Sequence, residues 1–136
     1  MDAQKQAAIE SLMKEETRFK ETIQKRIEEV NSLPDGLPGE IDANQWGVDV
    51  TIPYDLALIR QTRAVFGSDY RCNKYSTPHV SDSNGNFYMY LERKDDYHKK
   101  VILTASPTQA GSTCRRVQTG VKEMPVYTIV CDEVKT

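Results

Sequence analysis

The sequence predicts an α+β domain with a long N-terminal helix, a second short helix and a mainly antiparallel sheet of five to six strands. Apolar residues recur every three or four positions near the start of the chain, which is typical of an amphipathic helix. After Gly67 the pattern changes to alternation in short segments separated by turn residues, which is typical of strands. Helices followed by a run of strands favour an antiparallel sheet with helices on one face. The 136 residues are expected to form a single domain, 1–136.

The first segment, Asp2–Asn31, is predicted to be one continuous helix. Asp2 is a suitable N-cap, the segment contains no Gly or Pro, and Leu33-Pro34-Asp35-Gly36 would end it. Its apolar residues form a narrow stripe suited to a single groove. About 30 residues at 1.5 Å each give roughly 45 Å, so part of the helix is expected to overhang the domain and pack on a second copy. The alternative is a helix that lies across its own sheet.

Residues 34–46 are predicted to be an irregular connector. Two prolines and two glycines occur within Pro34-Asp35-Gly36-Leu37-Pro38-Gly39, which leaves little room for regular structure. The connector is either a linker or an ordered loop that closes over a site. Trp46, the only tryptophan, is expected to anchor the core. The connector separates a helical oligomerisation arm, residues 1–33, from an α/β-rich core, residues 47–136.

The core is predicted to begin with the alternating strand Val48–Ile52 and a helix from Pro53 through Phe66. Gly67 stands where glycine commonly follows a helix. Turn residues then separate five further strand candidates. These are Tyr70–Thr77, Phe87–Arg93, Lys100–Ala105, Thr113–Thr119 and Val126–Asp132.

The distribution of charge limits the classes of partner. Residues 1–50 carry six Lys/Arg and eleven Asp/Glu (net −5), and residues 51–136 carry the other twelve and nine (net +3), which together give −2. The second part is too weakly basic for a general binder of long DNA or RNA, but it suits a small anionic ligand. No apolar run reaches the roughly 20 residues of a membrane span, and no secretion signal is expected. The protein is therefore predicted to be cytoplasmic, without a membrane partner.

Residues that could ligate a metal are few and scattered. Cys72, Cys114 and Cys131 form no C-x-x-C pair, and His79 and His98 are the only histidines. A structural zinc site needs four close ligands, so neither a metal nor another cofactor is expected. The cysteines are predicted to be buried or half-buried thiols in a reducing cytosol.

The stretch from Tyr70 to Lys100 is the most informative part of the chain, because it holds six of the eleven aromatic residues together with six Lys and Arg residues. Aromatic faces stack on bases for about 1–3 kcal/mol each. Arginine binds phosphate through two parallel hydrogen bonds. The composition therefore predicts a nucleotide-binding sheet surface, with a solvated sheet face or a protein interface as the alternative.

Strand alternation within this stretch selects the candidate residues. The face of Phe87–Arg93 that resembles core carries Phe87, Met89, Leu91 and Arg93. Tyr88 and Tyr90 point the other way and form the candidate platform, with Phe87 at its rim. Arg115 and Arg116, on a neighbouring strand candidate, point to opposite faces, so only one of them can join the platform. The candidate ligand-binding residues are Arg26, Phe87, Tyr88, Tyr90, Arg93, Arg115 and Arg116.

Catalytic motifs are not found in the sequence, which contains no G-x-S-x-G, P-loop, G-x-G-x-x-G or H-E-x-x-H. His98 beside Asp95 and Asp96 could indicate a general base, but the composition is that of an ordinary turn. Cys114 adjoins Arg115, yet neighbouring strand residues point to opposite faces. The protein is therefore predicted not to be an enzyme.

With its long helix leading into a β-rich core that carries aromatic and arginine residues, the chain resembles the phage anti-Thoeris sponge proteins of the first type. The resemblance covers the whole chain as architecture and rests on residue types at Arg26, Phe87, Tyr88, Arg115 and Arg116. It implies a homo-oligomer that sequesters a small signalling nucleotide, such as a cyclic ADP-ribose isomer or a cyclic oligonucleotide, without cleaving it. A bacterial anti-phage effector would thereby lose its activator.

Three hypotheses for function follow. The first is a non-enzymatic nucleotide sponge whose pocket lies at a subunit interface. The second is a phage or bacterial protein–protein inhibitor or assembly module that acts through its Tyr-rich sheet face. The third is a small enzyme that processes nucleotides. Ligand-induced melting shifts would separate the first from the second, and turnover would identify the third.

Overall fold

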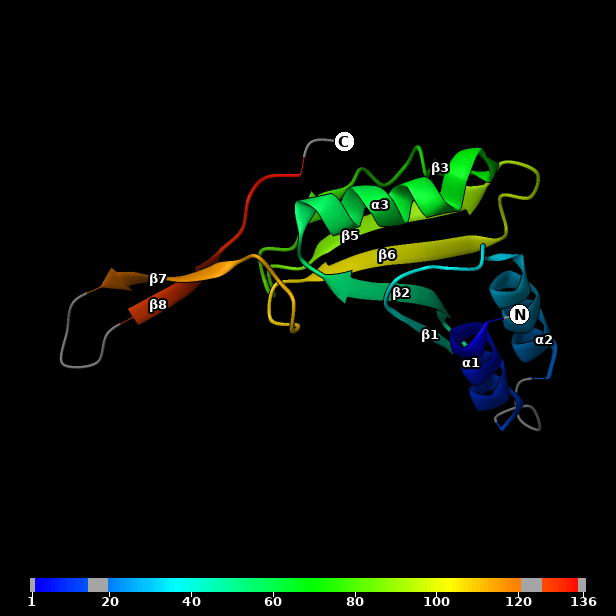
Figure 1. Ribbon diagram of the computed structural model, residues 1–136. Helices are drawn as coiled ribbons and strands as arrows, with labels where there is room; N and C mark the ends of the chain where they lie inside the picture. The colour runs from blue at the N-terminus through cyan, green and yellow to red at the C-terminus, as the bar shows by residue number, and fades with distance from the viewer. Residues whose placement is uncertain (1, 15–19, 121–125, 135–136) are drawn as a thin grey trace.

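The computed structural model describes residues 2–14, 20–120 and 126–134, and within the last two strands it leaves the side chains of residues 116–120 and 126–128 undescribed. The elements are α1 (Ala3–Met13), α2 (Lys20–Ser32), β1 (Glu40–Asn44), β2 (Gly47–Pro53), α3 (Leu56–Phe66), η1 (Gly67–Asp69), β3 (Tyr70–Cys72), β4 (His79–Val80), β5 (Phe87–Arg93), β6 (Lys100–Ser106), β7 (Arg115–Gly120) and β8 (Val126–Val130). The predicted α+β class is confirmed (Figure 1).

The main sheet has the strand order β1-β2-β6-β5-β3, and the short β4 also pairs with β5. Strands β2 and β6 run parallel, whereas the other neighbouring pairs run antiparallel. The sheet is therefore mixed but mainly antiparallel. Strands β7 and β8 form a separate two-stranded sheet.

The core lies between the main sheet and the helices, and strand alternation decides which side chains enter it. In β2 every second side chain is buried, and the residues between them are half-buried. In β5, Phe87, Met89 and Leu91 are buried, while Tyr88 and Tyr90 on the other face are half-buried. The buried strand residues form one cluster with apolar side chains of α1, α2 and α3. The predicted division of Phe87–Arg93 into a core face and a Tyr face is thus correct for these five residues.

The predicted continuous helix is wrong, because the segment forms two helices that pack on each other. The Lys5 side chain, near the start of α1, donates a hydrogen bond of 2.9 Å to the carbonyl of Leu33, just after α2. Residues 15–19 lie outside the described chain. A stripe with a spacing of three and four residues is equally compatible with one helix and with two helices folded together. No overhanging long helix therefore exists among the described residues, and the length-based reason for a homo-oligomer does not hold.

The second helix was predicted correctly in kind, although it starts later than expected. Pro53 is the last residue of β2. Asp55 is the N-cap of α3, and its carboxylate accepts a hydrogen bond of 3.0 Å from the backbone N–H of Ala57. The helix ends at Phe66, before Gly67, which has a φ of 69°. None of the helices in the described parts of the chain combines the length and apolar character needed to cross a bilayer.

The predicted irregular connector contains β1, which pairs with β2 from Glu40 opposite Thr51 to Asn44 opposite Gly47. Gly39 permits this pairing because its φ of 112° is unfavourable for other residues, and a Cβ there would collide with the backbone of Thr51. Trp46, expected in the core, lies instead in the β1–β2 turn with 84% of its surface exposed. A strand of this kind is missed because its partner, rather than its own composition, determines its structure.

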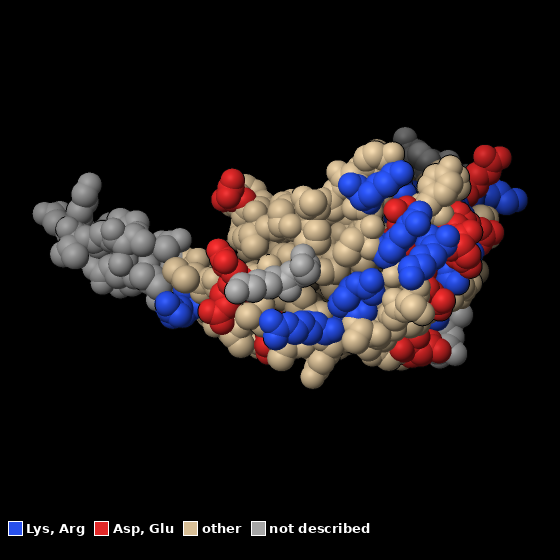
Figure 2. All heavy atoms as spheres, turned by 90° about the horizontal axis from the view of Figure 1, so that it is seen from above, with Lys and Arg blue, Asp and Glu red and all other residues tan. Residues whose placement is uncertain are grey.

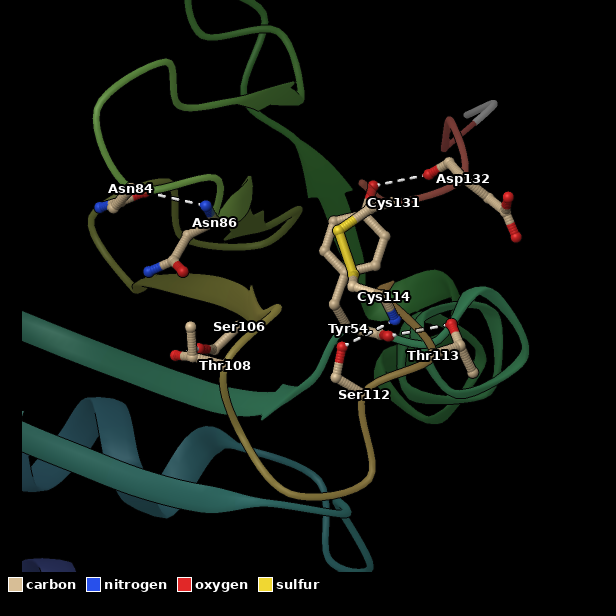
Figure 3. Close-up of a disulfide and its surroundings, with 10 residues drawn as sticks. All are labelled: Tyr54, Asn84, Asn86, Ser106, Thr108, Ser112, Thr113, Cys114, Cys131 and Asp132. Atoms are coloured by element: carbon tan, nitrogen blue, oxygen red, sulfur yellow. Dashed lines mark hydrogen bonds between the residues drawn. A yellow bond between two sulfur atoms is a disulfide. The ribbon is translucent and has the colours of Figure 1, made fainter. Parts of the chain in front are cut away.

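Strands β7 and β8 project from the main body as a hairpin (Figure 1). A disulfide between Cys114 and Cys131 joins the two chain segments at its base (Figure 3). The prediction of buried or half-buried thiols is therefore wrong: two cysteines are paired, and Cys72 is free and exposed. The hairpin's own pairing, with Arg115 opposite Val130, brings the two cysteines together.

Candidate functional site

A cavity of about 400 Å³ lies where β2 and β6 begin, beside α2. We call it the basic pocket because Lys25, Arg26 and Lys100 line it together with His98. Its remaining lining comes from the β1–β2 turn, the central strands and the segment after β3. These residues are Glu29, Trp46, Gly47, Val48, Asn73, Ser76, Tyr90, Leu91, Val101 and Ile102.

A buried ion pair forms part of the wall of the basic pocket. Arg26 Nη1 donates to both carboxylate oxygens of Glu29, at 2.7 and 2.8 Å, and Arg26 Nη2 lies 3.5 Å from the carbonyl oxygen of Gln45. Only 4% of the Glu29 side chain is exposed. Burial raises the pKa of the Glu29 carboxyl above its ordinary value, and the charge and hydrogen bonds of Arg26 act in the opposite direction. Arg26 is therefore paired with Glu29 through Nη1, and its buried Nε has no hydrogen-bond partner among the described residues.

The net positive charge of the pocket consequently comes from Lys25 and Lys100, whose side chains are exposed. Lys25 lies one residue before Arg26 on α2, and Lys100 is the first residue of β6. Exposed ammonium groups at a cavity rim can reorient toward an anion without breaking an internal contact. On the face seen from above, Lys and Arg side chains spread across the body, and Asp and Glu side chains lie toward both of its ends (Figure 2).

Two aromatic side chains, Trp46 and Tyr90, line the same cavity. The His79 ring stacks on Tyr90 with a centroid separation of 6.0 Å and an interplanar angle of 18°. Tyr88 shares the sheet face with Tyr90, but it does not line the pocket. Its hydroxyl accepts hydrogen bonds from Asn84 at 3.0 Å and from Asn86 at 3.3 Å, which bind it to the β4–β5 turn.

The other predicted site residues lie elsewhere. Phe87 is buried in the core with 2% exposure, so it cannot form the rim of a platform. Arg93 makes two hydrogen bonds to Asp95, at 2.8 and 3.1 Å, and one to the carbonyl of Ser32, and its guanidinium lies over the Tyr70 ring. It therefore fastens β5 to the end of α2 on the core side of the sheet.

Arg115 and Arg116 belong to β7, which is not a neighbour of the Tyr-bearing strand as the sequence predicted. Arg115 is exposed at the base of the hairpin, and the side chain of Arg116 lies outside the described part of the structure. Of the seven predicted residues, the structure brings only Arg26 and Tyr90 together in the basic pocket.

Sequence reasoning missed Trp46, Lys25, Lys100 and His98 as pocket residues. One available signal was the stretch Asn44-Gln45-Trp46-Gly47, in which Asn and Gly bracket a possible hairpin turn. A tryptophan within such a turn has little core to enter. The two lysines carried no comparable signal, because they meet only through the placement of α2 against the beginning of β6.

A second concavity of about 710 Å³ lies beyond the ends of β2 and β6, and we call it the acidic groove. Asp82, Asp132 and Glu133 line it, and no Lys or Arg is among its described lining residues. It passes between the β4–β5 turn and the segment after β8. The Tyr54 hydroxyl donates a hydrogen bond of 2.8 Å to the carbonyl of Asp132, beside the disulfide (Figure 3).

The protein is thus an α+β domain with a cavity at one end of its mixed sheet, and aromatic and cationic side chains line this cavity. No protein-family model, curated protein or solved structure matches the chain. Among the described residues, no group of three or more His, Cys, Asp or Glu side chains is placed to hold a metal ion.

Proposed function

We propose that the protein binds a small phosphorylated nucleotide in the basic pocket and holds it without chemical change. The observation that carries the proposal is the presence of two exposed lysines, Lys25 and Lys100, and two aromatic rings, Trp46 and Tyr90, around one cavity of about 400 Å³. Small-molecule sites are commonly of this size and combine aromatic walls with a few polar groups. Lysines suit phosphate, and rings suit a base.

The biological role that fits such binding is sequestration. The ligand that the sequence resemblance implies is a cyclic ADP-ribose-type signal or a cyclic oligonucleotide, withheld from a bacterial anti-phage effector in the host cytoplasm, although the long helix on which the resemblance partly rested is two helices. The homo-oligomer that the resemblance implies is part of the proposal.

The arrangement around His98 favours binding over catalysis. The Asp96 carboxylate accepts a hydrogen bond of 3.0 Å from the backbone N–H of His98, and the Asp95 carboxylate is held by Arg93. The His98 ring instead lies against Tyr97, with centroids 4.1 Å apart. A general base needs a partner that orients its imidazole, and these two carboxylates do not serve that purpose.

A melting experiment tests the proposal. The purified protein is mixed with AMP, ADP-ribose, cyclic ADP-ribose and cyclic dinucleotides in turn. A ligand at 100 times its Kd adds about 2.7 kcal/mol of stability, which raises Tm by several degrees.

Two variants accompany this experiment. The double variant Lys25→Ala/Lys100→Ala should lose the Tm shift, and Asp82→Asn in the acidic groove should keep it. Unchanged Tm across the panel would refute nucleotide binding, and chromatographic conversion of the ligand would show an enzyme.

A further inference from the structure

Trp46 is unusual because the only indole of the chain stands in water. Its exposure is 84%, although tryptophan is on average one of the more buried residues. The turn that carries it is held by its neighbour: the Asn44 side-chain oxygen accepts hydrogen bonds from the backbone N–H groups of Trp46, at 2.8 Å, and Gly47, at 3.3 Å. The backbone therefore presents the indole from a defined position.

That position is further fixed from behind by α2. The carbonyl of Gln45 lies 3.5 Å from Arg26 Nη2, and Arg26 is itself held by the buried Glu29. Arg26 thus connects the helix to the Trp46 turn. Such support from a rigid element is what a precise binding position requires.

The surroundings of Trp46 indicate what would cover it. The indole lines the basic pocket with the exposed ammonium groups of Lys25 and Lys100 and with Tyr90, which His79 backs on the sheet surface. An apolar partner surface would have to desolvate these lysines, which is unfavourable. A planar ring that carries an anionic group matches both features at once.

We propose that Trp46 is the stacking platform for the base of the ligand, and that it makes the pocket selective for phosphates that carry a planar ring over phosphates of sugars alone. This inference rests on the proposed function. It assigns recognition of the ring to Trp46 and recognition of the phosphate to Lys25 and Lys100, while Arg26 and Glu29 position the turn.

The experiment compares AMP and ADP-ribose with ribose 5-phosphate, which lacks the base, and with inorganic phosphate. Because Trp46 is the only tryptophan, its fluorescence reports on this pocket alone, and stacking of adenine should quench it. Affinities of the wild type, Trp46→Ala and Trp46→Phe are measured by calorimetry. Tyr75→Ala is the matched control, since Tyr75 has the same 84% exposure and does not line the pocket.

We expect AMP and ADP-ribose to bind Trp46→Ala about 5- to 150-fold more weakly than the wild type, as loss of one base–aromatic stack implies. Trp46→Phe should retain most of the affinity, and Tyr75→Ala all of it. Ribose 5-phosphate should bind the wild type and Trp46→Ala equally. An unchanged Tm without ligand would show that each variant is folded.

Two failures are distinguishable. If AMP or ADP-ribose binds the wild type and Trp46→Ala with equal affinity, the role of Trp46 is overturned while the proposed function stands. Equal affinity of the wild type for ribose 5-phosphate and AMP overturns it in the same way. If none of AMP, ADP-ribose, cyclic ADP-ribose and the cyclic dinucleotides binds the wild type, the proposed function fails and the inference fails with it.

Discussion

The basic pocket and the acidic groove lie at opposite ends of the same two parallel strands and differ in charge. The pocket, at the beginning of β2 and β6, carries Lys25 and Lys100, whereas the groove beyond their ends carries Asp82, Asp132 and Glu133. An anion is attracted to one end of the sheet and repelled from the other. The near-neutral net charge of −2 therefore conceals a division that composition alone does not show.

The two regions also differ in how they are supported. Side chains from α2, β5, β6 and the β1–β2 turn line the pocket, and Arg26 on α2, paired with Glu29 of the same helix, contacts the carbonyl of Gln45 in the turn. Loop residues line much of the groove, and the disulfide lies beside it. Sites built on regular elements hold their geometry better than sites built on loops. Charge and rigidity together favour the pocket as the ligand site, and each can be tested separately.

The largest effect is expected from Arg26→Met, which removes the partner of the buried Glu29. Breaking a buried pair from one side costs about 3–5 kcal/mol of unfolding free energy, because an uncompensated charge remains. Urea denaturation measures the loss. The exposed Arg60→Met on α3 is the control and should change stability by less than about 0.5 kcal/mol.

The double variant Arg26→Met/Glu29→Leu sharpens this test, since replacing both charges by apolar groups is often neutral or stabilising. It should recover most of the stability that the single variant loses. A single variant as stable as the wild type would mean that the pocket wall does not depend on the pair.

The second-largest loss of stability is expected when the disulfide beside the acidic groove is removed. Cys131→Ser opens a disulfide that closes a loop with a sequence separation of 17, and loops of this length are stabilised by about 3 kcal/mol. Unfolding should therefore require less urea in Cys131→Ser, and also in the wild type under reductant. Nucleotide binding in the basic pocket should persist.

Cys72→Ser is the matched control, because Cys72 is free and exposed. Equal stability of Cys72→Ser and Cys131→Ser would mean that the disulfide does not stabilise the fold. Disulfides persist mainly in oxidising compartments, so the redox state of the pair in cells would also test the predicted cytoplasmic location.

The third effect tests the difference in charge between the basic pocket and the acidic groove. Lys100→Ala should weaken AMP binding about tenfold, which corresponds to roughly 1.5 kcal/mol for a hydrogen bond to a charged group. Asp82→Asn at the opposite end should leave AMP affinity unchanged. Calorimetry at two salt concentrations measures both, and added salt should weaken wild-type binding more than Lys100→Ala binding. Equal losses in the two variants would contradict the assignment of the anion to the pocket.

The sequence was sufficient to predict the features that depend on local alternation. The buried positions Phe87, Met89 and Leu91, and the opposite placement of Tyr88 and Tyr90, followed from the period of two and are confirmed. The end of α3 at Phe66 followed from Gly67. In these cases the chemistry of neighbouring residues is enough, because the backbone geometry itself sets the period.

Features that depend on distant pairing could not be predicted. The helical stripe before Asn31 does not reveal where the chain turns back, and β1 is a strand only because β2 lies beside it. Arg115 was predicted beside the Tyr-bearing strand, but within the described chain β7 pairs with β8 in a separate sheet. That Trp46 lies beside Lys25 and Lys100 is likewise a property of tertiary packing, which is why these three residues were not predicted as a site.

The smallest effect is expected from Asp49→Asn, which probes the strand between the two charged ends. The Asp49 carboxylate accepts hydrogen bonds from Thr104, at 3.2 Å, and Thr51, at 3.4 Å. Burial raises its pKa above the ordinary value of 3.8, and the two threonines act in the opposite direction. A folded state with the higher pKa binds its proton more tightly than the unfolded state, so this group lowers stability as pH rises from about 3.8 through the raised pKa.

Asparagine removes the ionisation and keeps an acceptor oxygen for one threonine, while its amide N–H can donate to the hydroxyl oxygen of the other. The stability of Asp49→Asn relative to the wild type should therefore increase as pH rises through that window and then level off. Urea denaturation between about pH 3 and pH 7 measures this difference, with the exposed Asp82→Asn as the control. A relative stability that falls with rising pH would mean that the folded state stabilises the Asp49 carboxylate and lowers its pKa. In that case the middle of β2 would favour negative charge, as the basic pocket does.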